Sequence, residues 1–266
     1  MVGIDLDPKW EMSSISPQDM MICAAAREVK DKERVFVGIG LPVLATLLAQ
    51  KMYAPNAVLI YESGIIGAKP TRLALSIADP GLVSGSTMLV EFFDLFTMFL
   101  QNGNVDLGFV GGAQVDRFGN VNSTVIGSYS SPKKRLPGGG GAYDMTMAKR
   151  SIIIMAHEKR RFVEKVDFVT MPGHRIDGIS RKELGMPGIG PDLVISTMGV
   201  FRFDEAGEMY LYSFFKGTSP EQIRSNTGWN LKIATNVQEM RPPSNEELDA
   251  LRSLDPKGLI SGNKNK

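Results

Sequence analysis

The feature that most constrains the fold is a strand–helix–strand pattern close to the start of the chain. Two short apolar runs, Arg34-Val35-Phe36-Val37 and Val58-Leu59-Ile60-Tyr61, flank a stretch from Pro42 to Met52 with apolar residues on most faces. The runs are typical of buried strands, and the stretch between them is typical of a helix. Two strands joined by a helix over so few residues form a βαβ unit, whose strands are parallel and whose crossover is right-handed. The chain is therefore predicted to be an α/β protein.

The rest of the sequence predicts elements that extend this sheet. A helix capped by Ser16 should run from Pro17 to about Lys30. Other expected elements are strands over 105–110 and 151–155, hairpins over 113–126 and 193–215, short helices over 143–148 and from Ser219-Pro220, and a buried, Phe-rich helix over 88–100. We expect an open mixed, largely parallel sheet with helices on both faces. A single domain should span residues 16–260, after an N-terminal extension over 1–15 and before a disordered tail over 261–266.

Composition and charge narrow the possible functions. Of the 266 residues, 43% are hydrophobic and 22% are charged, as in a protein that can bury a large core. The formal net charge is +1, with basic and acidic residues well mixed, so a small-molecule substrate is expected rather than nucleic acid or an anionic membrane. The single cysteine, Cys23, cannot form an internal disulfide, and residues 1–10 lack the apolar core of a secretory signal, so we predict a cytoplasmic protein. No apolar stretch reaches the ~18 uncharged residues of a membrane span.

Glu62 is the strongest candidate for a catalytic residue. It ends the second apolar run and is followed at once by Ser63 and Gly64, small residues that let a ligand approach. In a parallel sheet the carboxyl ends of the strands open onto one edge, where ligands bind. Glu62 should therefore face the same crevice as Gly38-Ile39-Gly40, after the first strand, and Gly111-Gly112, after the third. The alternative is a strand-end glutamate that faces water or a lysine.

Several other kinds of site are disfavoured by spacing. Gly38-Ile39-Gly40 is followed by Val43 where a dinucleotide fingerprint needs its third glycine, and the run of four glycines at 138–141 lacks the Lys and Ser or Thr of a phosphate-binding loop. The two histidines, His157 and His174, are not spaced as metal ligands with a carboxylate or cysteine, so no metal is expected. A Gly-x-Ser-x-Gly hydrolase elbow is absent. The segment from His157 to Arg161 is interpreted as a solvated charged turn.

Once these sites are set aside, the remaining kind of site is a carboxylate nucleophile close to backbone donors. Glycine amides at Ile39-Gly40 and Gly140-Gly141 are expected to converge on Glu62. A carboxylate that attacks a thioester needs such neighbours, because the tetrahedral oxygen that develops negative charge must be met by positioned N–H donors. The residues expected to contact the substrate are Ser63, Gly64 and Gly112.

Several motifs occur in the order found in one known family. Over about residues 16–260 the sequence resembles the β subunit of family I CoA-transferases, in particular glutaconate CoA-transferase. The motifs are Val37-Gly38-Ile39-Gly40-Leu41-Pro42, Tyr53-Ala54-Pro55-Asn56, Glu62-Ser63-Gly64, Gly111-Gly112-Ala113-Gln114-Val115-Asp116, Gly119-Asn120-Val121-Asn122-Ser123, Gly140-Gly141-Ala142, His157-Glu158-Lys159-Arg160-Arg161-Phe162 and Thr227-Gly228. The resemblance implies a CoA-transferase (NagB/RpiA-like) fold, Glu62 as the nucleophile, and a site lined by Ile39, Gly40, Gly140 and Gly141.

The resemblance also implies a reaction and a partner. CoA would move from an acyl-CoA to a carboxylic acid, in particular a dicarboxylic acid, by ping-pong chemistry through a glutamyl-CoA thioester on Glu62. Coenzyme A is then a substrate, and no other cofactor is implied. The chain would form a hetero-oligomer with an α subunit of related fold that supplies much of the acyl pocket. The basic run Lys133-Lys134-Arg135 could meet CoA phosphates or be solvated.

Two alternatives stay open. The same scaffold carries two-chain enzymes that hydrolyse a C–C bond of an acyl-CoA or decarboxylate an acyl-CoA, and in these relatives the β-chain glutamate is replaced. Because this sequence keeps Glu62, CoA transfer is favoured over both. A non-catalytic partner subunit is the second alternative, and the presence of Glu62 together with both glycine segments argues against it.

Overall fold

The computed structural model describes residues 15–38, 40–70 and 72–262. Its centre is a ten-stranded sheet in the order β16-β15-β14-β13-β10-β5-β1-β2-β3-β4. The five parallel strands in the middle are β13 (Pro191–Ser196), β10 (Arg150–Met155), β5 (Leu107–Val110), β1 (Arg34–Val37) and β2 (Val58–Tyr61). The flanking strands are β14 (Gly199–Phe203), β15 (Met209–Phe214) and β16 (Lys232–Glu239) at one end, and β3 (Ile65–Ile66) and β4 (Met88–Leu89) at the other. Antiparallel pairs join β13 to β14, β14 to β15, β2 to β3 and β3 to β4, so the predicted mixed sheet is confirmed.

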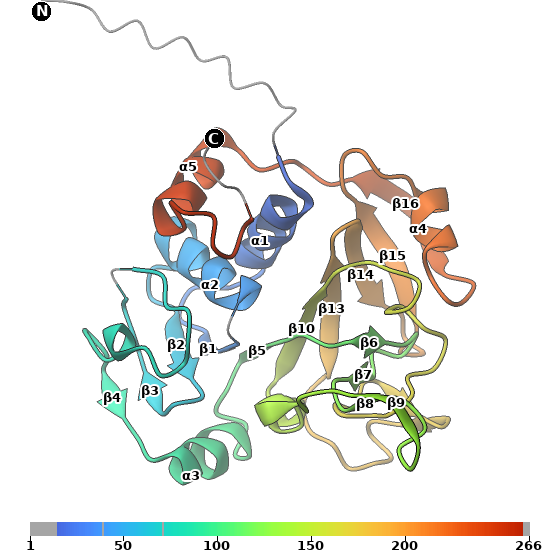
Figure 1. The fold of residues 1–266 in the computed structure, drawn as a ribbon, viewed down its shortest axis with the longest axis horizontal. Helices are drawn as coiled ribbons and strands as arrows, with labels where there is room; N and C mark the ends of the chain where they lie inside the picture. Colours follow the sequence, from blue (N-terminus) through green and yellow to red (C-terminus); the bar gives the residue numbers. More distant parts are fainter. Residues whose placement is uncertain (1–14, 39, 71, 263–266) are drawn as a thin grey trace, which may run out of the picture.

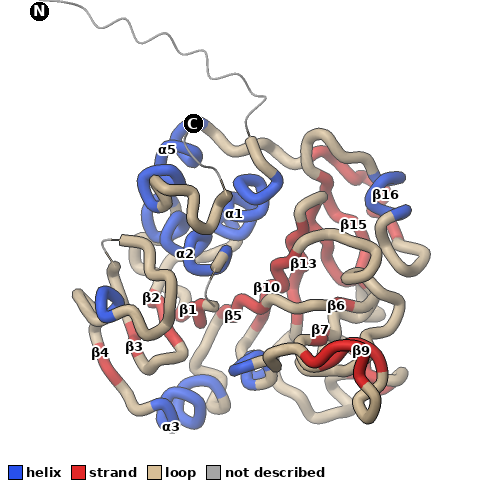
Figure 2. Tube along the Cα trace, viewed as in Figure 1, coloured by secondary structure: helices blue, strands red, loops and turns tan. Residues whose placement is uncertain are grey.

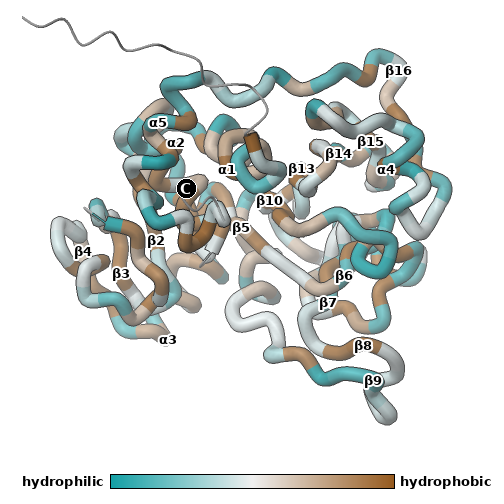
Figure 3. Tube along the Cα trace, turned by 45° about the horizontal axis from the view of Figure 1, so that its top comes forward, coloured by the Kyte–Doolittle hydropathy of each residue, from teal (hydrophilic) through white to brown (hydrophobic). Residues whose placement is uncertain are grey.

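Three α-helices cover one face of the sheet, as Figures 1 and 2 show. They are α1 (Pro17–Arg27), α2 (Leu41–Met52) and α5 (Asn245–Leu254). Val35 and Val37 of β1 belong to the core on this face, whereas Phe36 between them belongs to a second core on the opposite face. Successive side chains of a strand point to opposite faces, so both sides of these strands are buried, as is usual in parallel sheets. Figure 3 accordingly shows brown segments along the central strands and teal along much of the outer chain.

The second face is covered by short helical segments and hairpins. The helical segments are α3 (Phe92–Asp94), the π-helix η3 (Leu95–Leu100), the 3-10 turns η4 (Gly140–Ala142) and η5 (Asp144–Met147), and α4 (Pro220–Ser225). Two hairpins follow β5 along the chain. The first pairs β6 (Gln114–Val115) with β7 (Val121–Asn122), and the second pairs β8 (Val125–Gly127) with β9 (Pro132–Arg135). A third pairs β11 (Arg175–Ile176) with β12 (Ile179–Ser180), and the 3-10 turn η2 (Pro80–Leu82) lies between β3 and β4. The expectation of helices on both faces is confirmed.

The prediction of a buried, Phe-rich helix over 88–100 is confirmed for a helical course over 92–100 and is wrong for its start and its burial. The segment forms β4, α3 and η3, and of its large side chains only Leu95 and Leu100 are fully buried. Phe92, Phe93 and Met98 are exposed, Phe93 at 74%. Apolar residues occur around the whole circumference of this segment, but a helix that rests on a sheet buries a single stripe.

The interpretation of residues 157–161 as a solvated turn is wrong for its first residue. The His157 ring is buried and stacks on Phe162, with ring centroids 3.9 Å apart. Its Nδ1 and Nε2 atoms lie 3.2 Å from the hydroxyl oxygens of Ser196 and Thr227. Burial lowers the pKa of His157 to about 4, so its ring is neutral at pH 7.

Several element boundaries differ from the prediction. Helix α1 ends at Arg27, and the run expected to be one strand over 193–203 is divided into β13 and β14. The division occurs where the Ser196 hydroxyl accepts hydrogen bonds from the backbone N–H groups of Met198 and Gly199. The disordered tail was expected from residue 261, but Ser261 is buried and donates a hydrogen bond to the Asp255 carboxylate. Residues 263–266 and almost all of the expected N-terminal extension lie outside the described residues.

The helices of the described residues are all too short or too polar to cross a lipid bilayer.

Candidate active site

The β2–β3 turn fixes the position of Glu62. Glu62 is the first residue after β2, and Gly64 N–H closes the turn by donating to the Tyr61 carbonyl at 2.9 Å. Gly64 has φ +88°, and a Cβ on it would lie 2.0 Å from the Val90 carbonyl oxygen. Only glycine fits this conformation and this contact. Glu62 is therefore held at the carboxyl edge of the sheet, partly exposed, by hydrogen bonds on both sides of it.

The structure brings Glu62 together with Gly140 and Gly141. A Cβ built on Gly140 would lie 3.5 Å from Glu62 Oε1, and a Cβ built on Gly141 would lie 3.7 Å from the same oxygen. Gly140 has φ +51°, in the left-handed region that favours glycine. The 3-10 turn η4 thus leaves open the space beside the carboxylate, whereas a role for its N–H groups as oxyanion donors stays a prediction.

Glu62 lines a cavity of about 150 Å³ at the ends of three neighbouring strands. Gly38 follows β1, Glu62 follows β2 and Gly111 follows β5, and all three border the cavity. The apolar part of the wall is formed by Phe36, Phe109, Val110, Ala142 and Met145. Glu62 is the one charged residue among the described residues that line it. Within the described part of the chain, no hydrogen bond or ion pair engages the carboxylate. It is therefore free to react with a bound electrophile.

The sequence did not identify the apolar wall of this cavity. Met145 reaches the sheet because Gly108 leaves room for it, since a Cβ there would lie 2.6 Å from the Met145 sulfur. Phe96 lies behind Gly141, where a Cβ would meet its ring at 3.0 Å, and it packs edge-on against Phe36 with centroids 6.3 Å apart. Gly111 and Phe36 could have been predicted to line the cavity, because each lies at the carboxyl end of a strand. The contact of Phe96 with Gly141 depends instead on the path of the π-helix.

The other predicted site residues are distributed differently. Ile39 lies outside the described residues, whereas Gly40 caps α2 with φ +90° and open space where a side chain would be. Ser63 is exposed beside Glu62, and Gly64 faces Val90. Gly112 lines a second cavity, and a Cβ on it would lie 2.4 Å from Val121 Cγ1. Gly64 and Gly112 thus have packing reasons to be glycine.

The second cavity, of about 280 Å³, adjoins the first. Gly111 borders both. The remaining lining residues are Gly112, Ala113, Ser123, Leu136, Pro137, Gly138 and Arg161. The two cavities therefore adjoin at Gly111, and we call them together the groove.

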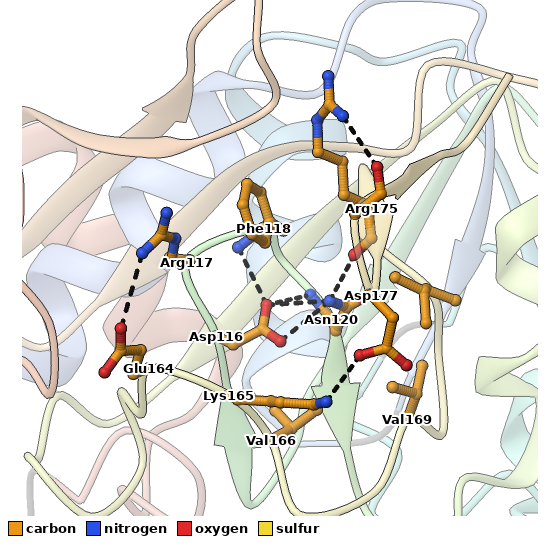
Figure 4. Close-up of a pocket in the computed structure, with 12 residues that line it drawn as sticks. Asp116, Arg117, Phe118, Asn120, Glu164, Lys165, Val166, Val169, Arg175 and Asp177 are labelled. Carbon is orange, nitrogen blue, oxygen red and sulfur yellow. Dashed lines mark hydrogen bonds and ion pairs between the residues drawn. The ribbon is translucent and has the colours of Figure 1, made fainter. Parts of the chain in front are cut away.

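A third cavity, of about 410 Å³, is shown in Figure 4. It lies beside the β6–β7 connection and has no lining residue in common with the cavity at Glu62. Lys165 pairs with Asp177 at 2.6 Å, and Arg117 lies 3.7 Å from Glu164. Burial raises the pKa of Asp116, although Asn120 donates to this carboxylate. Because each charged side chain named here has a partner, this cavity has no evident nucleophile among its described residues. The described residues also contain no cluster of three His, Cys, Asp or Glu side chains that could hold a metal ion.

Comparison with known proteins agrees with this geometry. The family model described as Coenzyme A transferase matches residues 18–226. A subunit of the 3-oxoadipate CoA-transferase of Pseudomonas knackmussii is 47% identical over 247 residues, which cover 92% of this chain and 95% of that protein. A subunit of the glutaconate CoA-transferase of Acidaminococcus fermentans is 37% identical over 256 residues, again 92% and 95% of the two chains.

Solved structures give the same result. The crystal structure of the Acidaminococcus fermentans glutaconate CoA-transferase matches with a TM-score of 0.86 at 34% identity, and the match covers 93% of this chain and 97% of that one. The structure of the decarboxylase AibA/AibB matches with a TM-score of 0.80 at 25% identity, over 93% and 98% of the chains. The fold, the cavity at Glu62 and these similarities have one explanation: the chain belongs to the coenzyme A transferase family.

Proposed function

We propose that this chain is the subunit of a CoA-transferase that carries the nucleophile, and that the nucleophile is Glu62. The observation that carries the proposal is the position of the Glu62 carboxylate, which lines a cavity and lies where a side chain on Gly140 or Gly141 would touch it. A carboxylate in this position can reach a thioester carbonyl bound in the cavity. Backbone N–H groups of the turn that carries Gly140 and Gly141 are the proposed donors to the charge that develops.

The reaction has two halves that are the reverse of each other. A Glu62 oxygen attacks the acyl-CoA carbonyl and displaces CoA thiolate, which leaves an acyl-glutamyl anhydride. The thiolate attacks the Glu62 carbonyl carbon, releases the first carboxylic acid as its carboxylate and forms a glutamyl-CoA thioester. A second carboxylate attacks that thioester to form a new anhydride, and the released thiolate then attacks its acyl carbon. The products are a new acyl-CoA and free Glu62, and no ATP is consumed because each step exchanges one activated acyl bond for another.

Each tetrahedral intermediate carries a negative oxygen that the site must stabilise. We assign this role to backbone N–H groups of the turn at 139–141, whose glycines leave space beside the Glu62 carboxylate. One well-aimed donor contributes roughly 3 kcal/mol to transition-state stabilisation. Phe36 and Phe109 give the cavity an apolar lining beside Glu62, and an acyl group that fills it would exclude water from the anhydride.

The substrate is proposed to be a dicarboxylic acid. The relatives at 47% and 37% identity are named for 3-oxoadipate and glutaconate, both of which are dicarboxylic acids. Coenzyme A takes part as a substrate, with no other cofactor, and we place the protein in the cytoplasm.

A partner subunit is proposed because both relatives are named as one subunit of their enzyme. Exposed apolar side chains beside the site support this: we call Met88, Leu89, Phe92, Phe93 and Met98 the apolar patch. Its residues belong to β4, α3 and η3, and Phe92 packs on Phe96 next to Gly141. An α subunit of related fold that covers this patch would complete the walls around Glu62.

Trapping the intermediate tests the proposed function. The complex of this chain with its partner is incubated with an acyl-CoA and no acceptor, and the peptide that contains Glu62 is weighed. A mass increase equal to CoA bound through a thioester supports CoA transfer. Product formation with an unmodified peptide supports the decarboxylase or hydrolase alternative, to which the similarity with AibA/AibB gives some weight.

A further inference from the structure

The groove has opposite charges at its two ends. Glu62 is the one charged residue among the described residues of the first cavity, and Arg161 is the one charged residue among those of the second. Between them the groove passes Gly111 and Gly112, and the Val121 side chain occupies the space that a side chain on Gly112 would fill. A ligand that extends along the groove therefore meets a carboxylate at one end and a guanidinium at the other.

The backbone of Arg161 is held rigidly. Its N–H donates to the Glu158 carbonyl at 2.7 Å, and its carbonyl accepts from Val115 N–H at 2.7 Å. The next residue, Phe162, is fully buried and stacks on His157. These contacts fix the position of Arg161 before any ligand binds, which reduces the entropy lost on binding.

The guanidinium keeps binding capacity. Arg161 Nε donates to Glu158 Oε1 at 3.1 Å, and Nη1 makes a long contact of 3.5 Å with the Gly112 carbonyl oxygen. The other Glu158 oxygen accepts from Arg160, so one carboxylate serves two guanidiniums and the group keeps a net positive charge. Arg160 is 77% exposed and does not line the cavity, whereas Arg161 is 32% exposed and does.

We propose that Arg161 binds the free carboxylate of the dicarboxylic substrate, the one remote from the reacting carbon, at the end of the groove opposite Glu62. This inference rests on the proposed function and identifies the residue that selects a dicarboxylic acid. Repulsion by Glu62 and attraction by Arg161 orient the acyl group with its activated end toward Glu62. Guanidinium groups suit this task because their parallel donors match the two oxygens of a carboxylate.

Phosphate groups of CoA are the other anions that Arg161 could meet, and kinetics can separate the two. The complex with the partner subunit is assayed with one acyl-CoA donor and two acceptors, adipate and hexanoate, which have equal numbers of carbon atoms but different numbers of carboxylates. Arg161→Met is expected to raise KM for adipate roughly 10- to 100-fold, the value of a hydrogen bond to a charged group. KM for hexanoate and for the donor should stay within about twofold. Arg161→Lys should recover part of the loss.

Arg160→Met is the matched control, because it removes the neighbouring positive charge and the other partner of Glu158. It should leave both acceptors unchanged, and melting temperatures of both variants report whether the fold is intact. Equal KM values for adipate in Arg161→Met and the wild type would overturn the inference. A rise in KM for the donor alone would also overturn it and assign Arg161 to a CoA phosphate.

Direct binding separates this inference from the proposed function. Calorimetric titration with adipate and hexanoate needs no turnover, so it reports on Arg161 even if the complex transfers no CoA. Tighter binding of adipate than of hexanoate in the wild type, lost in Arg161→Met, supports the assignment. Absence of CoA transfer together with this preference would contradict the proposed function and leave the anion site standing.

Discussion

A side chain on Gly140 would meet the Glu62 carboxylate: a Cβ there would lie 3.5 Å from Oε1 and 3.8 Å from Oε2. The two residues come from separate parts of the sequence, one from the turn after β2 and the other from the 3-10 turn before β10. A missing side chain at Gly140 keeps open the space above the carboxylate.

Gly140→Ala should therefore reduce activity more than stability. The φ of +51° costs an alanine about 1 kcal/mol, and the added methyl group contacts the carboxylate oxygens. We expect kcat/KM to fall by roughly tenfold or more. Gly217→Ala is the control, because Gly217 has φ +86° with open space around it and should show the same loss of stability with normal kinetics. Equal kinetics in the two variants would argue against a role for Gly140 at the site.

Glu62→Gln should abolish CoA exchange while the fold persists. The amide has the shape of the carboxylate but is a poor nucleophile, so the exchange rate should fall at least about a thousandfold. Stability should change by no more than about 0.5 kcal/mol, because Glu62 is partly exposed and no ion pair engages it within the described part of the chain. Exchange of a labelled carboxylic acid into its acyl-CoA measures the first effect, and thermal denaturation measures the second.

Glu247 joins the first and last helices, and its removal should destabilise the protein. Arg27 Nε and Nη2 donate to its two oxygens at 2.6 and 2.7 Å, Tyr53 donates to it as well, and its side chain is 1% exposed. Glu247→Gln would leave Arg27 without its full counter-charge, at a cost of about 3 kcal/mol. Thermal denaturation checks this. The exposed neighbour Glu246, changed to Gln, should have little effect.

The same carboxylate predicts acid sensitivity. Burial alone would raise the pKa of Glu247, but the hydrogen bonds from Arg27 and Tyr53 outweigh it and hold the pKa at about 2. Because the folded pKa lies below the ordinary value of 4.5, the stabilisation is fully present above pH 4.5 and is lost as pH falls toward 2. The difference in melting temperature between wild type and Glu247→Gln should shrink over this range. A constant difference would contradict the assignment.

His157 should make the protein sensitive to pH in a higher range. Its pKa is about 4 in the folded protein, against an ordinary value of 6.5, because burial disfavours the charged ring. The unfolded chain binds a proton that the folded chain does not, so stability is fully present above pH 6.5 and falls as pH drops toward 4, by about 3 kcal/mol at most. Melting temperature against pH should fall less steeply between these values in His157→Gln. An unchanged slope would show that the ring is protonated in the fold.

The apolar patch should determine assembly. Phe93→Asp places a charge on a side chain that is 74% exposed, so the free chain should keep its stability. Burial of that charge under a partner should reduce co-purification with the partner subunit and lower activity in parallel. Leu259→Asp adds the same charge to another exposed apolar residue outside the patch and should assemble normally.

The sequence predicted which strand ends lie side by side, because parallel topology determines it. Once residues 34–61 are recognised as a βαβ unit, Gly38 and Glu62 must lie at one edge of the sheet, and the structure has them lining one cavity. Glycine motifs were a weaker guide to which residues line the site. Gly64 and Gly112 fit the family pattern, but each is also required by a close contact, with Val90 and Val121 respectively, that local sequence does not reveal.

Burial was the quantity that sequence could not predict. The Phe-rich segment and the segment that begins with His157 were assigned from their own composition, whereas their exposure depends on neighbours far along the chain. His157 is buried because Phe201 and Thr227 lie beside it, and Phe93 is exposed because Leu95 and Leu100 occupy the stripe that faces the sheet. The same holds for Phe96, whose contact with Gly141 depends on the path of the π-helix.

The short strand β4 has a consequence for the preparation of this protein. It is the last strand in the order of the ten-stranded sheet, and its residues Met88 and Leu89 are exposed. Both side chains belong to the apolar patch, and an exposed apolar patch can associate with other copies of the same chain, which leads to aggregation. Production of this chain by itself should therefore yield insoluble or self-associated material, and co-expression with its partner should be the route to a soluble sample.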